Sequence, residues 1–315
     1  MHDHFPKVDD RSSFCCQFSQ NAGENLFASV KRNRVWFLLE YPYLWGEKAF
    51  EESDLDEPVK DYLDGLLNQT PDSKLLFIKN QDSLFSEEIN FFVGISDEIN
   101  PRLYRFQVDD YSDLLSIDLA RLLSGKNTYN EKQVTEPVFL VCTNGKRDPC
   151  CAKFGLEVYN QLTEYVGGSV WQSTHVGGHR FAANVVCFPH AIYYGRFNVD
   201  EAKILLETYP RSILLDKYRG RACYTPEVQA ADYYLRDYTN ESDMDAFRHI
   251  DTHPIAQNQW SITFSASQDP YLYKLKIRSE PSESPIYKGC RDEQPVYIDQ
   301  YRLVEIRILE DETST

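Results

Sequence analysis

Hydrophobic and polar positions alternate along the first 125 residues in blocks that predict strands and helices in turn. A nearly continuous apolar run at 35–41 is typical of a buried strand, and apolar residues between 59 and 67 recur at helical spacing. The order strand, helix, strand, strand, strand, helix favours a small α/β sandwich. The predicted strands lie at 35–41, 74–79, 91–95 and 103–108, and the predicted helices at 57–67 and 115–124.

A second block repeats this alternation after a polar connector at 126–136. The apolar run at 137–141 predicts a buried strand, and a helix with its apolar face between 154 and 166 ends at Gly167-Gly168. Two α/β sandwiches in tandem, each compatible with a thioredoxin-like layout, are the expected architecture. Further strands are predicted at 169–173, 183–188 and 191–194, and further helices at 199–209 and 226–236.

The two ends of the chain differ from these blocks. Residues 1–33 are polar, with a short possible helix at 26–30, and the termini at 1–11 and 311–315 are expected to fray. After residue 240, alternation at the strand period predicts a small β appendix with strands at 260–264, 272–277 and 301–309. The expected domains are a polar segment at 1–33, a degenerate thioredoxin-like domain at 34–130, a second thioredoxin-like domain at 131–240, and a β extension at 241–315.

Charge and apolar content exclude several classes of function. The 315-residue chain has a net charge of -16 and contains no run of Lys or Arg, which argues against a nucleic-acid or anionic-membrane surface. No apolar run approaches the length of a membrane span, and the N-terminus lacks the apolar core of a signal peptide. We therefore expect a soluble cytoplasmic protein with no nucleic-acid or membrane partner.

Eight cysteines carry much of the candidate chemistry, and no C-x-x-C spacing occurs among them. In a reducing cytosol such cysteines are metal ligands, catalytic thiols or buried small residues more often than disulfides. The missing C-x-x-C argues against a dithiol thioredoxin mechanism. We interpret Cys15 and Cys16 as a packed or partly exposed pair and Cys187 as a core residue, and Cys223 and Cys290 as isolated thiols, either of which could be exposed and redox-active.

The stretch from 142 to 184 combines thiols and imidazoles in a pattern that suits zinc or an iron–sulfur cluster. Cys142 ends a predicted strand, while Cys150 and Cys151 lie at the entry to a helix, whose N–H groups and dipole stabilise thiolates. Asn144-Gly145 supplies the turn between the cysteines. Cys150 and Cys151 cannot both face the same point, and spacing does not decide between them.

His175 and His179 follow in the same stretch, four residues apart. A helix would place both rings on one face, but Gly177-Gly178 between them indicates an unusual backbone or the close approach of a bulky group. A zinc protease needs Glu directly after the first His, where this chain has Val176. The pattern leaves open a bound metal or cluster, an incidental structural arrangement, and a catalytic thiol–imidazole pair.

Two long motifs in this stretch resemble the sucrase/ferredoxin-like family, whose members are thioredoxin-like proteins with a [2Fe–2S] cluster. They read Cys142-Thr-Asn-Gly-Lys-Arg-Asp-Pro-Cys-Cys151-Ala and His175-Val-Gly-Gly-His179-Arg-Phe-Ala-Ala-Asn184. Shorter likenesses at 45–48, 194–196, 219–221 and 229–231 extend over most of the chain, and the C-terminal β region matches least. The resemblance implies that the cluster is held by Cys142, Cys151, His175 and His179.

On this resemblance Cys150 is not a ligand, and Asn144 stands where many family members have His. Arg147, Asp148 and Arg180 flank the implied ligands. They could form hydrogen bonds around the cluster or dock a partner, or they could make local ion pairs that hold the loops.

The implied function is electron transfer or redox sensing. A reductase or another carrier is the expected but unidentified partner, because the chain has no nucleotide-binding glycine motif. Two imidazoles in place of thiolates raise the reduction potential relative to an all-Cys cluster. The alternatives are a Cys2His2 zinc-stabilised binding module and a thiol-dependent oxidoreductase using Cys150 or Cys151 with His175. A carrier is favoured over an enzyme with its own substrate, and glycosidase activity is not expected because no catalytic carboxylate pair is marked.

Overall fold

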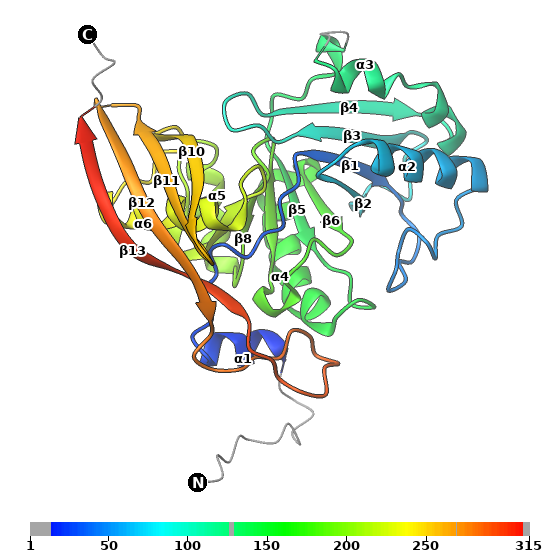
Figure 1. The fold of residues 1–315 in the computed structure, drawn as a ribbon. Coiled ribbons are helices and arrows are strands. Elements are labelled where there is room, and N and C mark those ends of the chain that lie inside the picture. The colour runs from blue at the N-terminus through cyan, green and yellow to red at the C-terminus, as the bar shows by residue number, and fades with distance from the viewer. Residues whose placement is uncertain (1–13, 126–128, 269, 311–315) are drawn as a thin grey trace.

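The computed structural model describes residues 14–125, 129–268 and 270–310. Within these ranges the chain forms one large mixed sheet of nine strands and a separate antiparallel sheet of four strands (Figure 1). Helices pack against both sheets. The predicted mixed α/β class is confirmed.

The first half builds one end of the large sheet from a strand–helix–strand unit followed by two antiparallel strands. β1 runs parallel to β2 and antiparallel to β3, and β3 pairs antiparallel with β4, which confirms the four predicted strands. Pro58 occupies the first turn of the predicted helix, α2. The bounds are β1 (Val35–Glu40), α2 (Glu57–Gln69), β2 (Ser73–Lys79), β3 (Ile89–Ile95) and β4 (Arg102–Val108).

The single helix predicted at 115–124 is wrong, because two shorter segments replace it: the 3-10 helix η1 (Tyr111–Ser116) and α3 (Leu119–Leu123). Asp118 separates them, since its carboxylate accepts a hydrogen bond from the N–H of Arg121 and starts a new helix there. Short polar side chains that bond to the local backbone interrupt a helix that apolar spacing alone would continue.

The second half repeats the same pairing pattern at the other end of the sheet. β5 runs parallel to β6 and antiparallel to β7, which pairs antiparallel with β8. α4 begins before its predicted apolar face because Asp148 caps it and Pro149 fills its first position. The strands are β5 (Val138–Cys142), β6 (Val170–Ser173), β7 (Val185–Phe188), β8 (Ile192–Tyr194) and β9 (Tyr218–Arg221), and the helices are α4 (Pro149–Val166), α5 (Val199–Thr208) and α6 (Pro226–Thr239).

Pairing between β2 and β6 joins the two halves into one sheet of order β4-β3-β1-β2-β6-β5-β7-β8-β9. The junction is antiparallel and short, with Ile78 opposite Ser173. One buried cluster spans it, because Trp36 of the first half packs in the same core as Leu140 and Trp171 of the second. The halves are thus continuous through backbone hydrogen bonds, and the predicted domain boundary near residue 130 stays a prediction.

The C-terminal region forms the four-stranded sheet in the order β10-β11-β12-β13, packed on α6. Its strands are β10 (Phe247–Ala256), β11 (Gln259–Ala266), β12 (Tyr271–Pro281) and β13 (Asp299–Glu310). The expected β appendix is confirmed, but β10 was not predicted because most of its residues are exposed or half-buried and show no alternation. Between β12 and β13 the chain makes an excursion at 282–298, which lies beside α1 (Cys15–Asn21) in Figure 1.

The N-terminal expectation needs a correction. The helix lies at α1 (Cys15–Asn21) rather than at 26–30. Residues 26–30 form a turn in which Ala28 has a left-handed φ of 58°, a conformation that a helix cannot contain. The termini expected to fray lie outside the described residues. Across the described ranges, no helix is both long and apolar enough to cross a membrane.

Among the described residues there are also four short 3-10 helices, at η2 (Asn130–Lys132), η3 (Gly167–Ser169), η4 (His179–Phe181) and η5 (Leu215–Lys217).

Candidate metal centre

Strand β5 and helix α4 bring Cys142 and Cys151 together. Cys142 is the last residue of β5, Cys151 lies in the first turn of α4, and both are buried. Gly155, one turn further along α4, permits this approach, since a Cβ there would lie 2.2 Å from the carbonyl oxygen of Cys142. The helix therefore packs directly against the end of the strand.

His175 completes a group of three candidate ligands. It follows β6, which runs parallel to β5, so the segments that carry His175 and Cys142 leave the sheet at the same edge. Its Nδ1 lies 3.9 Å from Sγ of Cys142 and 3.8 Å from Sγ of Cys151. One ligand atom from each of the three residues falls within 4.8 Å of the others.

His179 lies beside this group, but its ring nitrogens are not among the ligand atoms that fall within 4.8 Å of one another. Its ring centre is 5.1 Å from that of His175, and its Nε2 lies 3.7 Å from Oδ2 of Asp148. Both ring nitrogens are buried, and neither has a hydrogen-bond partner of normal geometry among the described residues. Buried polar atoms without partners are rare in proteins, so an imidazole in this state fits a metal ligand.

The segment between the two histidines is an irregular loop. Gly177 and Gly178 have φ values of 109° and 70°, so the helical arrangement that would have put both rings on one face does not occur. The unusual backbone that the glycine pair indicated is confirmed.

Arg219 lies behind this loop and holds it. Its guanidinium is buried and donates hydrogen bonds to the carbonyl oxygens of Gly177 and Ser29 and to Oδ1 of Asn184. A Cβ on Gly178 would lie 2.3 Å from Nη2 of Arg219, which explains the second glycine. The sequence analysis noted the segment 219–221 only as a family likeness and assigned Arg219 no role.

Contacts within the group perturb its ionisation. A hydrogen bond from Cys151, with help from His175, lowers the pKa of Cys142, while the same contact and burial raise the pKa of Cys151. Burial lowers the pKa of His179, although Asp148 opposes that effect. One readily formed thiolate and a neutral imidazole are the protonation states that a metal ion needs.

Three flanking residues anchor the surrounding loops. Arg147 pairs with Glu47 at 2.9 Å, and Arg180 pairs with Glu24 at 2.7 Å, so both arginines make local ion pairs. Asn144 donates through Nδ2 to the carbonyl oxygen of Gly46.

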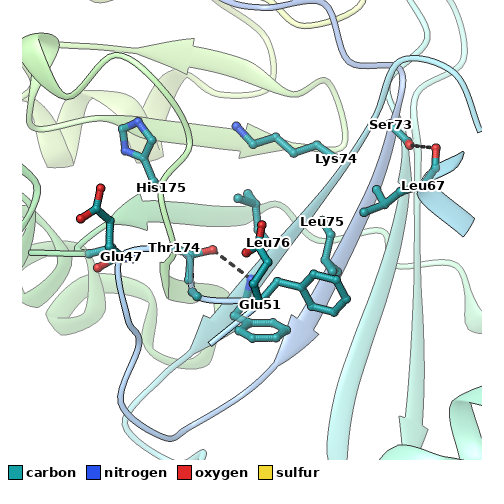
Figure 2. Close-up of a pocket in the computed structure, with 13 residues that line it drawn as sticks. Glu47, Glu51, Leu67, Ser73, Lys74, Leu75, Leu76, Thr174 and His175 are labelled. Carbon is teal, nitrogen blue, oxygen red and sulfur yellow. Dashed lines mark hydrogen bonds between the residues drawn. The ribbon is translucent and has the colours of Figure 1, made fainter. Parts of the chain in front are cut away.

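A pocket opens beside His175, which is the candidate ligand that lines it. Figure 2 shows the ammonium end of Lys74 and the ring of His175 facing each other across it, with Glu47 and Glu51 nearby. Nζ of Lys74 donates to the carbonyl oxygen of Val176 at 2.6 Å. Burial lowers the pKa of Lys74 to about 8, and the nearby Cys142 partly offsets this effect. The sequence analysis did not identify Lys74.

Cys150 faces away from this centre and meets the cysteines that had been read as separate. Cys15 and Cys16 are buried against it, and Cys290 reaches it from the 282–298 excursion. Cys290 was expected to be isolated, and that expectation is wrong because tertiary contact brings it to α4. Cys187 is fully buried, which confirms its assignment to the core.

Fold and site together define an α/β protein with buried cysteine and histidine groups that could bind a metal ion. Residues 26–220 match the model of the sucrase/ferredoxin-like family, and the chain belongs to that family.

Two curated relatives share the name "Altered inheritance of mitochondria protein 32". The protein from Meyerozyma guilliermondii is 33% identical over 112 residues, which cover 32% of this chain and 40% of the relative. The protein from Debaryomyces hansenii is 31% identical over 107 residues, which cover 30% of this chain and 39% of the relative. The chain therefore spans well under half the length of these relatives. No solved structure matches it.

Proposed function

We propose that this protein carries one [2Fe–2S] cluster on Cys142, Cys151, His175 and His179 and serves in electron transfer or redox sensing. The observation that carries the proposal is the pair of buried, unpartnered ring nitrogens on His179, beside two thiols and a second imidazole in contact. Membership of the sucrase/ferredoxin-like family supports this cluster type over others. The repeated strand order in the two halves supports two thioredoxin-like units.

A bound cluster would supply a site that takes up and releases one electron, and the chain's own residues set how easily it does so. Imidazole ligands reduce the negative charge of the site relative to four thiolates, which raises the reduction potential. Arg219 and Lys74 lie behind the histidine loop and next to Cys142, where positive charge favours the reduced form. Asp148 near His179 acts in the opposite direction.

The pocket beside His175 is the proposed route to a redox partner. His175 is half-buried and lines this pocket, so its ring is the candidate ligand nearest to an approaching protein. Glu51 in the pocket lining and the net charge of -16 favour a partner with a basic surface. All eight cysteines lie in described segments and are free thiols, which fits a reducing compartment such as the cytosol. The name of the two relatives refers to mitochondria.

Anaerobic purification of the full chain tests the proposal. The protein should be red-brown, contain two iron atoms per chain, and lose visible absorption on reduction with dithionite. Replacing His179 with Ala should remove or destabilise the cluster, and the matched control Cys223→Ser should keep it, since Cys223 lies outside both cysteine groups. A colourless, iron-free protein after reconstitution with iron and sulfide would refute the proposal.

A second candidate is a zinc site on the same residues, and one observation favours it. The Sγ–Nδ1 distances of 3.8 and 3.9 Å are close to the separation of about 3.6 Å between a thiolate and an imidazole on one tetrahedral zinc. Ligands on the two irons of a cluster lie farther apart. One zinc per chain and no iron, in protein made with both metals supplied, would establish this alternative.

A further inference from the structure

Four cysteines from three distant parts of the chain converge outside the centre described above. Sγ of Cys150 lies 3.4 Å from Sγ of Cys15, 3.3 Å from that of Cys16 and 3.3 Å from that of Cys290. The sulfurs of Cys15 and Cys290 are also 3.4 Å apart. Cys15, Cys150 and Cys290 therefore form a nearly equilateral triangle of sulfurs, with Cys16 beside one corner.

These thiols are held by separate elements of the fold. Cys15 and Cys16 begin α1, Cys150 lies in the first turn of α4, and Cys290 belongs to the 282–298 excursion. Apolar packing surrounds them, since Phe14, Ala182 and Tyr287 belong to the same cluster. The four thiols therefore lie together in a largely buried, apolar part of the protein.

The spacing suits a single ion. Four thiolates bound tetrahedrally to zinc at about 2.3 Å lie about 3.8 Å from one another. The sulfurs of Cys15, Cys150 and Cys290 are close to this spacing, and with a carboxylate oxygen of Asp148 their ligand atoms all fall within 4.8 Å of one another. A disulfide requires about 2.0 Å, and no pair among these cysteines approaches it. A [2Fe–2S] cluster would separate two of the sulfurs from the other two, which a triangle with equal sides does not allow.

The carboxylate of Asp148 hydrogen-bonds to the backbone of two of these cysteines. Its Oδ1 accepts from the N–H of Cys150 and its Oδ2 accepts from the N–H of Cys290, each at 2.9 Å. Both oxygens accept hydrogen bonds from the backbone of two of the cysteines, so the carboxylate positions them. Cys16, whose sulfur contacts that of Cys150, is the cysteine beside this group that can supply a fourth sulfur. The N–H of Cys15 also points at Sγ of Cys290, at 3.4 Å, as backbone donors do around metal-bound thiolates.

We propose that Cys15, Cys16, Cys150 and Cys290 form a second metal site, a structural four-cysteine site for zinc, distinct from the centre at Cys142 and His175. An ion of this kind with four thiolates has no open position and fastens the elements that supply its ligands. Here it fastens α1 and the 282–298 excursion onto the start of α4. The excursion in turn covers His179, because a Cβ at Gly289 would lie 2.9 Å from its Nε2.

Metal analysis of the full chain, three test variants and one control variant tests the second site. Wild-type protein should hold one zinc ion per chain beyond the metal of the first centre. Cys290→Ser and Cys150→Ser should each lose that zinc and keep the metal of the first centre, whereas Cys142→Ser should show the reverse. Cys223→Ser is the matched control and should keep both. Full retention of zinc by Cys290→Ser, or wild-type protein with metal at the first centre only, overturns the proposal.

Thiol protection gives a second measurement that needs no substitution. In metal-loaded wild-type protein, Cys15, Cys16, Cys150 and Cys290 should resist N-ethylmaleimide, and a zinc chelator should increase their reaction at least tenfold. Cys223, also half-buried, serves as the internal reference and should react equally in both states. Peptide mapping that finds a disulfide among the four, or protection that does not change with chelator, refutes the site.

Discussion

Replacing Gly155 with Ala should disturb the first metal centre from inside helix α4. The ideal Cβ at this position would lie 2.2 Å from the carbonyl oxygen of Cys142, whereas real Cβ atoms essentially never approach a heavy atom closer than 3.0 Å. This carbonyl oxygen belongs to the backbone at the end of β5, so it cannot rotate away as a side chain could. The helix must therefore move away from the strand by roughly 0.8 Å, which is more than the about 0.5 Å that a precise ligand site tolerates.

The expected cost combines two opposed effects. Ala has a higher helix propensity than Gly by about 1 kcal/mol, which alone would stabilise α4. Overpacking a buried contact costs about 1–3 kcal/mol and occasionally more, and this contact is severe. We expect a net loss of about 1–2 kcal/mol in the free energy of unfolding, together with weaker metal binding, because Cys151 lies one turn before Gly155 and moves with it.

Gly65→Ala provides the matched control. Gly65 lies inside α2, and the nearest atom to its ideal Cβ is the side-chain nitrogen of Gln69 at 3.9 Å, so nothing opposes the substitution. This variant should gain about 0.5–1 kcal/mol. Urea denaturation of both variants and metal content per chain are the measurements. A Gly155→Ala protein as stable as Gly65→Ala, with full metal, would show that the close approach of α4 and β5 does not hold the centre together.

Three further perturbations test the residues around the two sites and one distant histidine. Arg219→Lys should lower the free energy of unfolding by about 2–3 kcal/mol and reduce metal content, because one ammonium cannot satisfy the several buried acceptors that the guanidinium reaches; urea titration and metal analysis check this. Asp148→Asn should keep the cap of α4 but lose an acceptor for Cys290, so hydrogen exchange at 282–298 should accelerate while the rest of the chain is unchanged. Burial lowers the pKa of His190 to about 4, so the folded state binds this proton less readily than the unfolded state. The free energy of unfolding should therefore fall by up to about 3 kcal/mol as the pH drops from 6.5 to 4. Urea titrations of His190→Gln, which keeps a hydrogen-bond partner for Tyr209, should show a smaller dependence on pH.

The sequence indicated where the candidate ligands Cys142, Cys151 and His175 come together, because they follow strand ends and a helix start. Apolar runs indicate β5 and β6, and parallel strands place Cys142 and His175 at the same edge. Spacing could not choose between Cys150 and Cys151, because adjacent helical residues point about 100° apart and either could have faced the centre. Only the family motif chose Cys151, and the contact of its sulfur with His175 agrees with that choice.

The second group could not be found in the sequence because its contacts depend on tertiary structure. Cys15 and Cys290 are 275 positions apart, and they meet only after the four-stranded sheet has returned the chain to α1. No local period marks the 282–298 excursion, and a lone cysteine in a polar loop gives no signal of its own. Arg219 was missed for a related reason, since a buried arginine paired with carbonyl groups has the same sequence pattern as a surface arginine.

The first turn of α4 links the two sites physically. Cys150 and Cys151 point to opposite groups because the helix rotates about 100° between them, so a rigid helix start fixes both sets of sulfurs at once. Asp148 lies between them, where its two oxygens cap Cys150, hold Cys290 and approach His179. Under the two proposals, the adjacent cysteines that spacing could not resolve are not alternatives, because each serves its own site.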